Sequence, residues 1–523
     1  MAAKKGKSIR QAVRLITRQA EPRDIAEIQA VMRNAYPTMA IYPADQLQGQ
    51  MNNFPEGQFV AVYDGRVVGY CATFIADEAD ALSPHTWRSI TGDGFASRHR
   101  PLGDWLYGME TFVDPSVRGM RIGRRLYDER RRVCQAHGLR GIVIAGRLPR
   151  LARFLKQGGG AAQYLEEVRT GRRRDPVATF QIANDFEVRG LLPDYLPSDA
   201  ESAGFAALMV WRNPQLDDSA RLEAKRRRSA AVQTIRVALA QYAMKPVASF
   251  AAFAAQVRFA VETAAVNSSD FLLLPEHFTL QLLSMESEKL DAEAAVRRMT
   301  DHGPALHELM AGLSVRRNIN IVAGSQLVLG ADGAVRNVCR IYLRDGAVHE
   351  QVKLHPTPDE SRHWGVAGGT DLDAIPTDCG PIGVAICYDA EFPEVTRHLV
   401  DQGARILFVP ACTDSRQAFM RVRHCAAARA VENQCFVAVA GTVGNLDGVG
   451  NLDAHYAQSC VLTPCDVMFP PDGVALELEP NCETTAVVDL QLSALWTGRN
   501  AGAVQQLRDR RFDLYSVRWR ADA

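Results

Sequence analysis

The sequence lacks long apolar runs and has no excess of charge of either sign. Among 523 residues, 60 Asp plus Glu balance 60 Lys plus Arg, so the formal net charge is zero. Such a balance argues against a dedicated nucleic-acid binder. No segment approaches about 20 uninterrupted apolar residues, so we expect no transmembrane helix and no membrane partner. No apolar signal core follows the basic residues 1–7, so we predict a cytoplasmic protein.

The cysteines show no disulfide framework and no metal-site spacing. There are eleven of them, and neither the pair Cys379 and Cys387 nor the pair Cys460 and Cys465 has the spacing of zinc ligands. We therefore expect free thiols in a reducing compartment and no metal site.

The length suits roughly two to four domains. The composition, 47% hydrophobic and 23% charged, is that of an ordinary globular protein. We expect a disordered lead at 1–12, a first domain at 13–212, a linker at 213–233 and a second domain at 234–492. The remaining tail, 493–523, is aromatic and basic, and we expect it to pack on a partner subunit.

One cysteine of the second domain stands where a nucleophile would be well placed. Ile382 to Ile386 is a short apolar run after Gly-Pro, which is typical of a buried strand. Cys387 comes where that strand should end, before a turn. Most cysteines in such a position are buried and structural. Other residues must therefore show whether Cys387 is a nucleophile.

Two charged residues also stand at the ends of expected strands. Glu276 ends the apolar run that begins at Phe271, and Lys353 ends the second strand of an expected hairpin. Attack on an amide needs a thiolate, a base that takes the thiol proton and a cation that stabilises the oxyanion. Glu276 can be the base, Lys353 the cation and Cys387 the sulfur. An activated thiol titrates well below the ordinary pKa of about 8.5.

These segments resemble the carbon-nitrogen hydrolase (nitrilase) superfamily, over about Thr234 to Leu492. The resemblance assigns the family's catalytic triad to Glu276, Lys353 and Cys387, and a second active-site glutamate to Glu360. An exposed loop acid is the alternative for Glu360. The residues after Cys387, Tyr-Asp-x-x-Phe-Pro-Glu, are similar to those of the amidase and carbamoylase branches. We therefore expect hydrolysis of a small amide or carbamoyl compound through a thioester, without a cofactor.

The strand and helix patterns of this domain alternate, with hairpins between them. The pattern suits an α/β fold of two mixed sheets packed face to face with helices outside. The resemblance implies the same architecture, a four-layer αββα sandwich that often forms dimers, so we expect a homodimer or larger homo-oligomer.

The first domain contains a strand, a glycine-containing loop and a helix in succession. Trp105 to Val113 is the expected strand, and Arg124 to His137 the expected helix. Free N–H groups at such a helix start can bind an anion. We also expect an early helix capped by Asp24, a hairpin with Asp64-Gly65 at its turn, and a late strand at Phe180 to Ile182.

The loop resembles the pyrophosphate-binding loop of the GNAT superfamily of acyl-CoA N-acyltransferases, which implies a GNAT-like α/β domain. Acetyl-CoA or another acyl-CoA is the implied cofactor. The residues that would bind it are Val113, Arg118, Gly119, Met120, Arg121, Ile122, Gly123 and Arg124. Arg121 stands where the family usually has glycine, so the loop either gains charge or is too crowded.

Glu110, on the strand before the loop, is a candidate general base for acetyl transfer, and Tyr164 is a weaker candidate acid. A strand-surface acid is the alternative for Glu110. Two further functions stay open for the whole chain. The hydrolase half could support an N-acyltransferase that acts on a small amine. Alternatively, the GNAT half could be a non-catalytic ligand sensor or dimerisation module.

Overall fold

The protein is described from a computed structural model over residues 15–101, 103–216, 219, 221–223, 234–286, 290–446 and 454–520. The expected lead at 1–12 and most of the expected linker at 213–233 lie outside these residues. The chain forms two compact units, Met1–Ser229 with Phe512–Leu514, and Ala230–Arg511 with Tyr515–Ala523. No helix of the described ranges is long and apolar enough to span a membrane.

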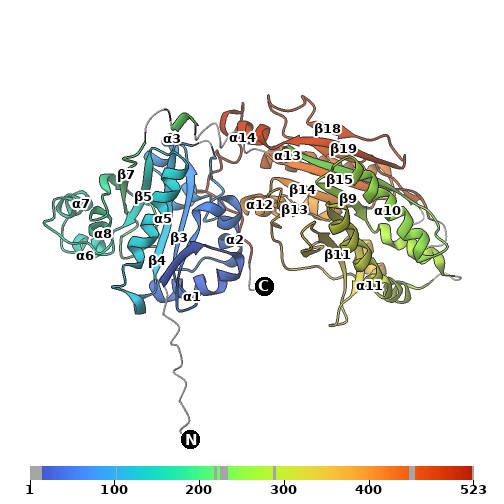
Figure 1. The fold of residues 1–523 in the computed structure, drawn as a ribbon, viewed down its shortest axis with the longest axis horizontal. Helices are drawn as coiled ribbons and strands as arrows, with labels where there is room; N and C mark the ends of the chain where they lie inside the picture. Colours follow the sequence, from blue (N-terminus) through green and yellow to red (C-terminus); the bar gives the residue numbers. More distant parts are fainter. Residues whose placement is uncertain are drawn as a thin grey trace, which may run out of the picture. The chain divides into compact units, whose positions relative to one another are not determined.

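The N-terminal unit is built on one seven-stranded sheet, in the order β1-β2-β3-β4-β5-β7-β6. Figure 1 labels four of these strands, β3, β4, β5 and β7. Only β4 and β5 pair in parallel; the other pairs are antiparallel. Its strands are β1 (Leu15–Gln19), β2 (Phe59–Tyr63), β3 (Arg66–Ala76), β4 (Trp105–Val113), β5 (Gly141–Arg147), β6 (Glu187–Leu192) and β7 (Ala206–Arg212). Its helices are α1 (Ile25–Ala35), α2 (Ala44–Asn53), α3 (Glu78–Leu82), α4 (Trp87–Thr91), α5 (Ile122–Ala136), α6 (Leu151–Leu155), α7 (Ala161–Arg169) and α8 (Ala178–Ile182).

The hairpin β2–β3 confirms the turn expected at Asp64-Gly65. Both residues have a left-handed backbone, with φ of 52° and 78°, as the tightest hairpin turns require. Helix α5 packs across β2, β3 and β4. It begins directly after the loop at Arg118 to Arg121, so the strand, loop and helix expected there are present.

Two local expectations for this unit were wrong. Phe180 to Ile182 is part of helix α8 instead of a strand, because the Asp175 carboxylate accepts hydrogen bonds from the N–H groups of Val177 and Ala178 and so starts a helix. Asp24 occupies the N-cap position of α1 without capping it. Its carboxylate pairs with Arg18 instead.

The C-terminal unit contains a sheet of twelve strands that folds back on itself. The path runs β12-β11-β10-β9-β8-β15-β14-β13, with β19 beside β8 and β17 beside β15. The strands are β8 (Thr234–Met244), β9 (Phe271–Glu276), β10 (Asn320–Leu329), β11 (Val335–Tyr342), β12 (Val348–Val352), β13 (Ile382–Val384), β14 (Ile406–Ala411), β15 (Phe436–Asn445), β16 (Ala454–His455), β17 (Cys460–Leu462), β18 (Val474–Glu477) and β19 (Thr484–Gln491). The helices are α10 (Phe250–Val266), α11 (Ala292–Arg317), α12 (Pro393–Asp401), α13 (Arg416–Asn433) and α14 (Leu492–Ala501), with shorter helical turns η4 (Phe278–Met285), η5 (Glu360–Trp364) and η6 (Cys387–Glu391).

Successive side chains of a strand point to opposite faces of the sheet, so alternate residues join two different hydrophobic cores. In β8, Val237 and Leu239 join the core between the two halves of the sheet. Ala238 and Ala240 instead join the core beneath α10 and α11. Helices α12 and α13 pack on the other half, at β13, β15 and β17. The expected αββα sandwich is therefore present, with both faces of its central strands buried.

Several residues of the described tail pack on the C-terminal unit. Arg405 lies over the ring of Trp496, 4.8 Å from its centroid, and Trp519 stacks on His398 at 5.0 Å. Arg510 forms a buried ion pair with Asp401. Contact with a partner subunit stays a prediction, as does the homo-oligomer itself.

Candidate functional site

The expected catalytic residues come together at one edge of the sandwich. Strands β8, β9, β10, β13, β14 and β15 all run in the same direction, because each pairs in parallel with its neighbour in this set. Strand β12 also runs in this direction, because β10 pairs antiparallel with β11, and β11 pairs antiparallel with β12. Glu276 ends β9, Lys353 directly follows β12, and Cys387 follows β13. Carboxyl ends of parallel strands share one edge, which is where such folds place ligands.

The Lys353 ammonium group lies between two carboxylates. Its Nζ is 2.8 Å from Glu276 Oε1 and 2.6 Å from Glu360 Oε2. Asn337, near the start of β11, donates through Nδ2 to the same two carboxylates, at 2.9 Å and 2.8 Å. Lys353 and Glu276 are each only 1% exposed. The carboxylates therefore share two donors in a dry site, which fixes their positions.

Cys387 is held in a conformation that favours glycine. Its φ is 48°, which costs a residue with a side chain of order 1–3 kcal/mol. The thiol lies 4.0 Å from the carbonyl oxygen of Cys412, the residue that follows β14. The N–H of Cys412 donates to Glu276 Oε2 at 3.0 Å. The backbone of Cys412 thus contacts both the sulfur and the expected base.

The charges of the cluster set the resting protonation states. Burial raises the pKa of Cys387 well above its ordinary value, and Glu276 raises it further, while Lys353 opposes the rise without cancelling it. Burial would lower the pKa of Lys353, but the carboxylates of Glu276 and Glu360 raise it. The resting site therefore holds a protonated thiol beside a charged ammonium. This differs from the pre-formed thiolate that a lowered thiol pKa would give.

Glu360 is a buried ionised carboxylate, not an exposed loop acid. Burial would raise its pKa, but the hydrogen bond with His277 and the charge of Lys353 lower it well below the ordinary value. Its Oε2 also accepts from the N–H of Thr357 at 2.8 Å. Glu276, His277 and Glu360 offer ligand atoms within 4.8 Å of one another, yet the Lys353 ammonium already supplies positive charge between the two carboxylates.

The N-terminal loop has the backbone that a glycine-containing anion loop needs. Gly119 has φ of 89° and Arg121 has φ of 58°, so Arg121 adopts the left-handed conformation despite its side chain. That side chain is exposed, so it does not crowd the loop. α5 starts at Ile122, and the first N–H groups of a helix favour an anion. The N–H groups of this loop and of the first turn of α5 could therefore hold a pyrophosphate group.

Strands β4 and β5 separate beside this loop. Their parallel pairing ends at Gly108 with Ile144, while β5 continues to Arg147. No strand among the described residues pairs on that side with the part of β4 beyond this point, which includes Glu110 and Val113. The opening suits a ligand that forms main-chain hydrogen bonds. Tyr164, by contrast, is fully buried and its hydroxyl donates to Asp175, which does not suit a catalytic acid.

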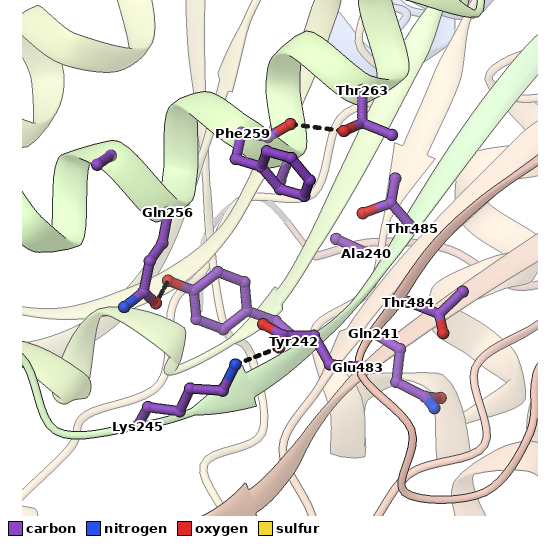
Figure 2. A pocket seen from close by; sticks show the side chains of 12 residues that line it. Ala240, Gln241, Tyr242, Lys245, Gln256, Phe259, Thr263, Glu483, Thr484 and Thr485 are labelled. Carbon is purple, nitrogen blue, oxygen red and sulfur yellow. Dashed lines mark hydrogen bonds and ion pairs between the residues drawn. The ribbon is translucent and has the colours of Figure 1, made fainter.

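A cavity of about 670 Å³ lies elsewhere, between α10 and strands β8 and β19 (Figure 2). Its wall includes Tyr242, whose hydroxyl donates to Gln256 at 3.1 Å, and the ion pair of Lys245 with Glu483. None of the four expected catalytic residues lines it. It opens on the helix side of the sheet and is separate from the Cys387 cluster.

Comparisons with known proteins match both units. The carbon-nitrogen hydrolase family model matches residues 236–495, and the acetyltransferase (GNAT) family model matches residues 25–158. The chain is 38% identical to the probable hydrolase YhcX of Bacillus subtilis (strain 168) over 507 residues, which cover 97% of this chain and 98% of that protein.

The chain belongs to the carbon-nitrogen hydrolase (nitrilase) superfamily, with an N-terminal GNAT domain.

Two further relatives each match one part of this carbon-nitrogen hydrolase. The uncharacterized N-acetyltransferase YkwB of Bacillus subtilis (strain 168) is 30% identical, over 34% of this chain and 78% of its own length. The deaminated glutathione amidase of Synechocystis sp. (strain PCC 6803 / GT-S) is 29% identical, over 35% of this chain and 69% of its own length.

Sequence reasoning missed three residues that contact the hydrolase cluster. Asn337 gave no signal, because a polar residue in a strand pattern indicates a solvent face. His277 directly follows Glu276, and its Nε2 lies 3.2 Å from Glu360 Oε1. Cys412 follows a buried strand, β14, and so shows the same strand-end signal as Cys387.

Proposed function

We propose that Cys387, Glu276 and Lys353 hydrolyse a small amide or carbamoyl compound through a thioester, with Glu360 holding Lys353 in place. The observation that carries the proposal is the buried cluster in which Lys353 joins two carboxylates beside a cysteine in a left-handed turn.

In the first half of the reaction, Glu276 takes the thiol proton as the sulfur attacks the carbonyl carbon. The two Lys353 hydrogen bonds to carboxylates leave a third N–H, since an ammonium has three donors. That N–H can stabilise the oxyanion that forms. The carbon–nitrogen bond then breaks, and Glu276 returns the proton to the leaving amine or ammonia.

In the second half, a water molecule loses a proton to Glu276 and attacks the thioester carbonyl. The carbon–sulfur bond breaks, the acid is released, and the thiolate takes the proton back. A base that serves both halves must stay close to the sulfur. Its hydrogen bonds from Lys353, Asn337 and the Cys412 N–H keep Glu276 in that position.

The substrate class rests on two supports. The residues after Cys387 are similar to those of amidases and carbamoylases, and one relative of the hydrolase half is an amidase of deaminated glutathione. Ammonia release from a panel of small amides, carbamoyl compounds and nitriles is the test, with Cys387→Ala as the inactive variant. Cys465→Ala, at an exposed cysteine, is the matched control. No product above the Cys387→Ala background would rule out hydrolysis as the main activity.

The N-terminal half supports a second activity. The opening beyond Gly108 and the loop at Arg118–Gly123 fit an acyl-CoA, which when bound would supply an activated acyl group. Val113 and the unpaired part of β4 would hold the pantetheine arm by main-chain hydrogen bonds. The N–H groups of the loop and the start of α5 would hold the pyrophosphate.

Calorimetry of the full chain with acetyl-CoA tests this binding. Heat in wild type that decreases in Arg118→Gln and Arg124→Gln supports it, and no heat at high micromolar protein would count against it. Binding without transfer to any amine would favour a ligand-sensing module over an N-acyltransferase.

A further inference from the structure

Two tyrosine hydroxyls contact the Glu110 carboxylate of the N-terminal unit. The Tyr36 hydroxyl donates to Glu110 Oε1 at 3.2 Å, and the Tyr42 hydroxyl donates to Oε2 at 2.8 Å. Trp87 stacks on Tyr42 with 5.7 Å between ring centroids. Glu110 and Tyr36 are both partly exposed, so a small solute can reach them. A carboxylate attracts an ammonium group by its charge, and an aromatic face nearby can add a cation–π contact.

A second set of rings extends the same cluster. His85 Nδ1 lies 2.7 Å from the carbonyl oxygen of Ser83 and must carry the proton of that bond. His85 Nε2 therefore accepts from the Tyr107 hydroxyl at 2.8 Å, which in turn accepts from Tyr195 at 3.1 Å. Burial lowers the pKa of His85, so the ring is neutral near pH 7. The cluster has no histidine cation to compete with an ammonium ligand.

A guanidinium group lies over the ring of Tyr36. Arg147, the last residue of β5, lies over the Tyr36 ring at 5.2 Å from its centroid. It pairs with Asp199 through Nε and Nη2, at 2.6 Å and 2.7 Å, and Nη2 also contacts Glu201 at 3.1 Å. Its Nη1 makes no hydrogen bond to any residue that the structure describes. That edge can donate to a carboxylate.

We propose that this cluster binds a free α-amino acid, with the ammonium at Glu110 and the aromatic rings and the carboxylate at Arg147 Nη1. Tyr36 contacts both groups, Glu110 through its hydroxyl and Arg147 through its ring. Glu110 lies two residues beyond the last β4–β5 pair, so the ammonium nitrogen would lie beside the strand opening. The proposal deepens the acyltransferase activity proposed above by naming the acceptor.

The test uses the unmodified full chain and no acyl donor. A thermal-shift screen of the free L-amino acids selects the one that raises the melting temperature most, and calorimetry then measures its affinity. Its decarboxylated amine and its deaminated acid are the matched probes; for L-leucine these are 3-methylbutylamine and 4-methylpentanoate. We expect both to bind at least about tenfold more weakly, as loss of one charged contact implies.

Two results would overturn the proposal: no amino acid binds, or the amine binds as tightly as the amino acid. Glu110→Gln should weaken the amino acid and the amine alike, whereas Arg147→Met should weaken only the amino acid. Arg173→Met is the matched control, because Arg173 also lies over an aromatic ring, that of Phe154, and pairs with Glu167. If Arg147→Met does not fold, the comparison of the three ligands still decides. Because neither amide substrate nor acyl-CoA is present, failure here is separate from failure of either activity proposed above.

Discussion

The protonation of Cys387 should respond in opposite directions to its two charged neighbours. The buried cluster holds one cation, Lys353, and two carboxylates, Glu276 and Glu360, so its net charge is negative before the thiol ionises. Glu276 raises the pKa of Cys387, and Lys353 lowers it. Glu276→Gln should therefore move alkylation of Cys387 to lower pH, and Lys353→Met should move it to higher pH.

The size of the shift follows from the charges. At about 4 Å and an effective dielectric constant of about 20, one unit charge contributes about 4 kcal/mol, or about 3 pKa units. Neighbouring charges in proteins shift pKa values by about 1–3 units. We expect a shift of that size for each variant, downward for Glu276→Gln and upward for Lys353→Met.

Iodoacetamide labelling against pH, followed by peptide mass spectrometry, measures each cysteine separately. Cys465 is exposed and serves as an internal reference in every sample. Lys245→Met is the matched control for the lysine, since Lys245 pairs with Glu483 at the separate cavity of Figure 2. The electrostatic argument would be refuted if both variants moved the pH dependence of Cys387 labelling in the same direction. It would also be refuted if Cys465 showed the same shifts as Cys387.

Three further outcomes follow from the structure. Asn337→Ala removes a hydrogen-bond donor from two buried carboxylates and should lower the free energy of unfolding by about 1–3 kcal/mol. Urea denaturation measures this change, and Asn267→Ala, at the exposed end of α10, is the control. Arg121→Gly relieves a left-handed residue and should raise that free energy by about 1 kcal/mol, while acetyl-CoA binding weakens with the lost charge. The Glu360 contribution to stability, from a pKa lowered on folding, is present above its ordinary pKa of 4.5 and is lost as pH falls below it. Glu360→Gln should therefore flatten the fall in unfolding free energy between neutral and acid pH.

Each of these outcomes has a result that contradicts it. An Asn337→Ala protein as stable as Asn267→Ala would mean that water replaces the lost donor. An Arg121→Gly protein less stable than wild type would mean that the arginine side chain makes a stabilising contact. A Glu360→Gln protein with the same pH profile as wild type would place the acid sensitivity in other carboxylates.

Much of the architecture could be predicted from the sequence because the signals were local. Apolar runs before Glu276 and Cys387 and a hairpin pattern before Lys353 indicated the strand ends, and Asp64-Gly65 indicated a hairpin turn. Phe180–Ile182 was wrongly predicted as a strand because three residues are too few to distinguish a helical from a strand periodicity. Asp175, whose carboxylate starts the helix, lies outside these three residues.

The sequence by itself determined which groups are chemically competent and at which strand ends they stand, because chain direction and side-chain alternation are properties of neighbouring residues. Only the tertiary structure decided that Asn337 joins Glu276 to Glu360, that the resting thiol is protonated, and that Glu110 and Arg147 both contact Tyr36. Those facts depend on the order of strands in the sheet, and on burial and charge summed over residues distant in the chain. No local pattern carries that information.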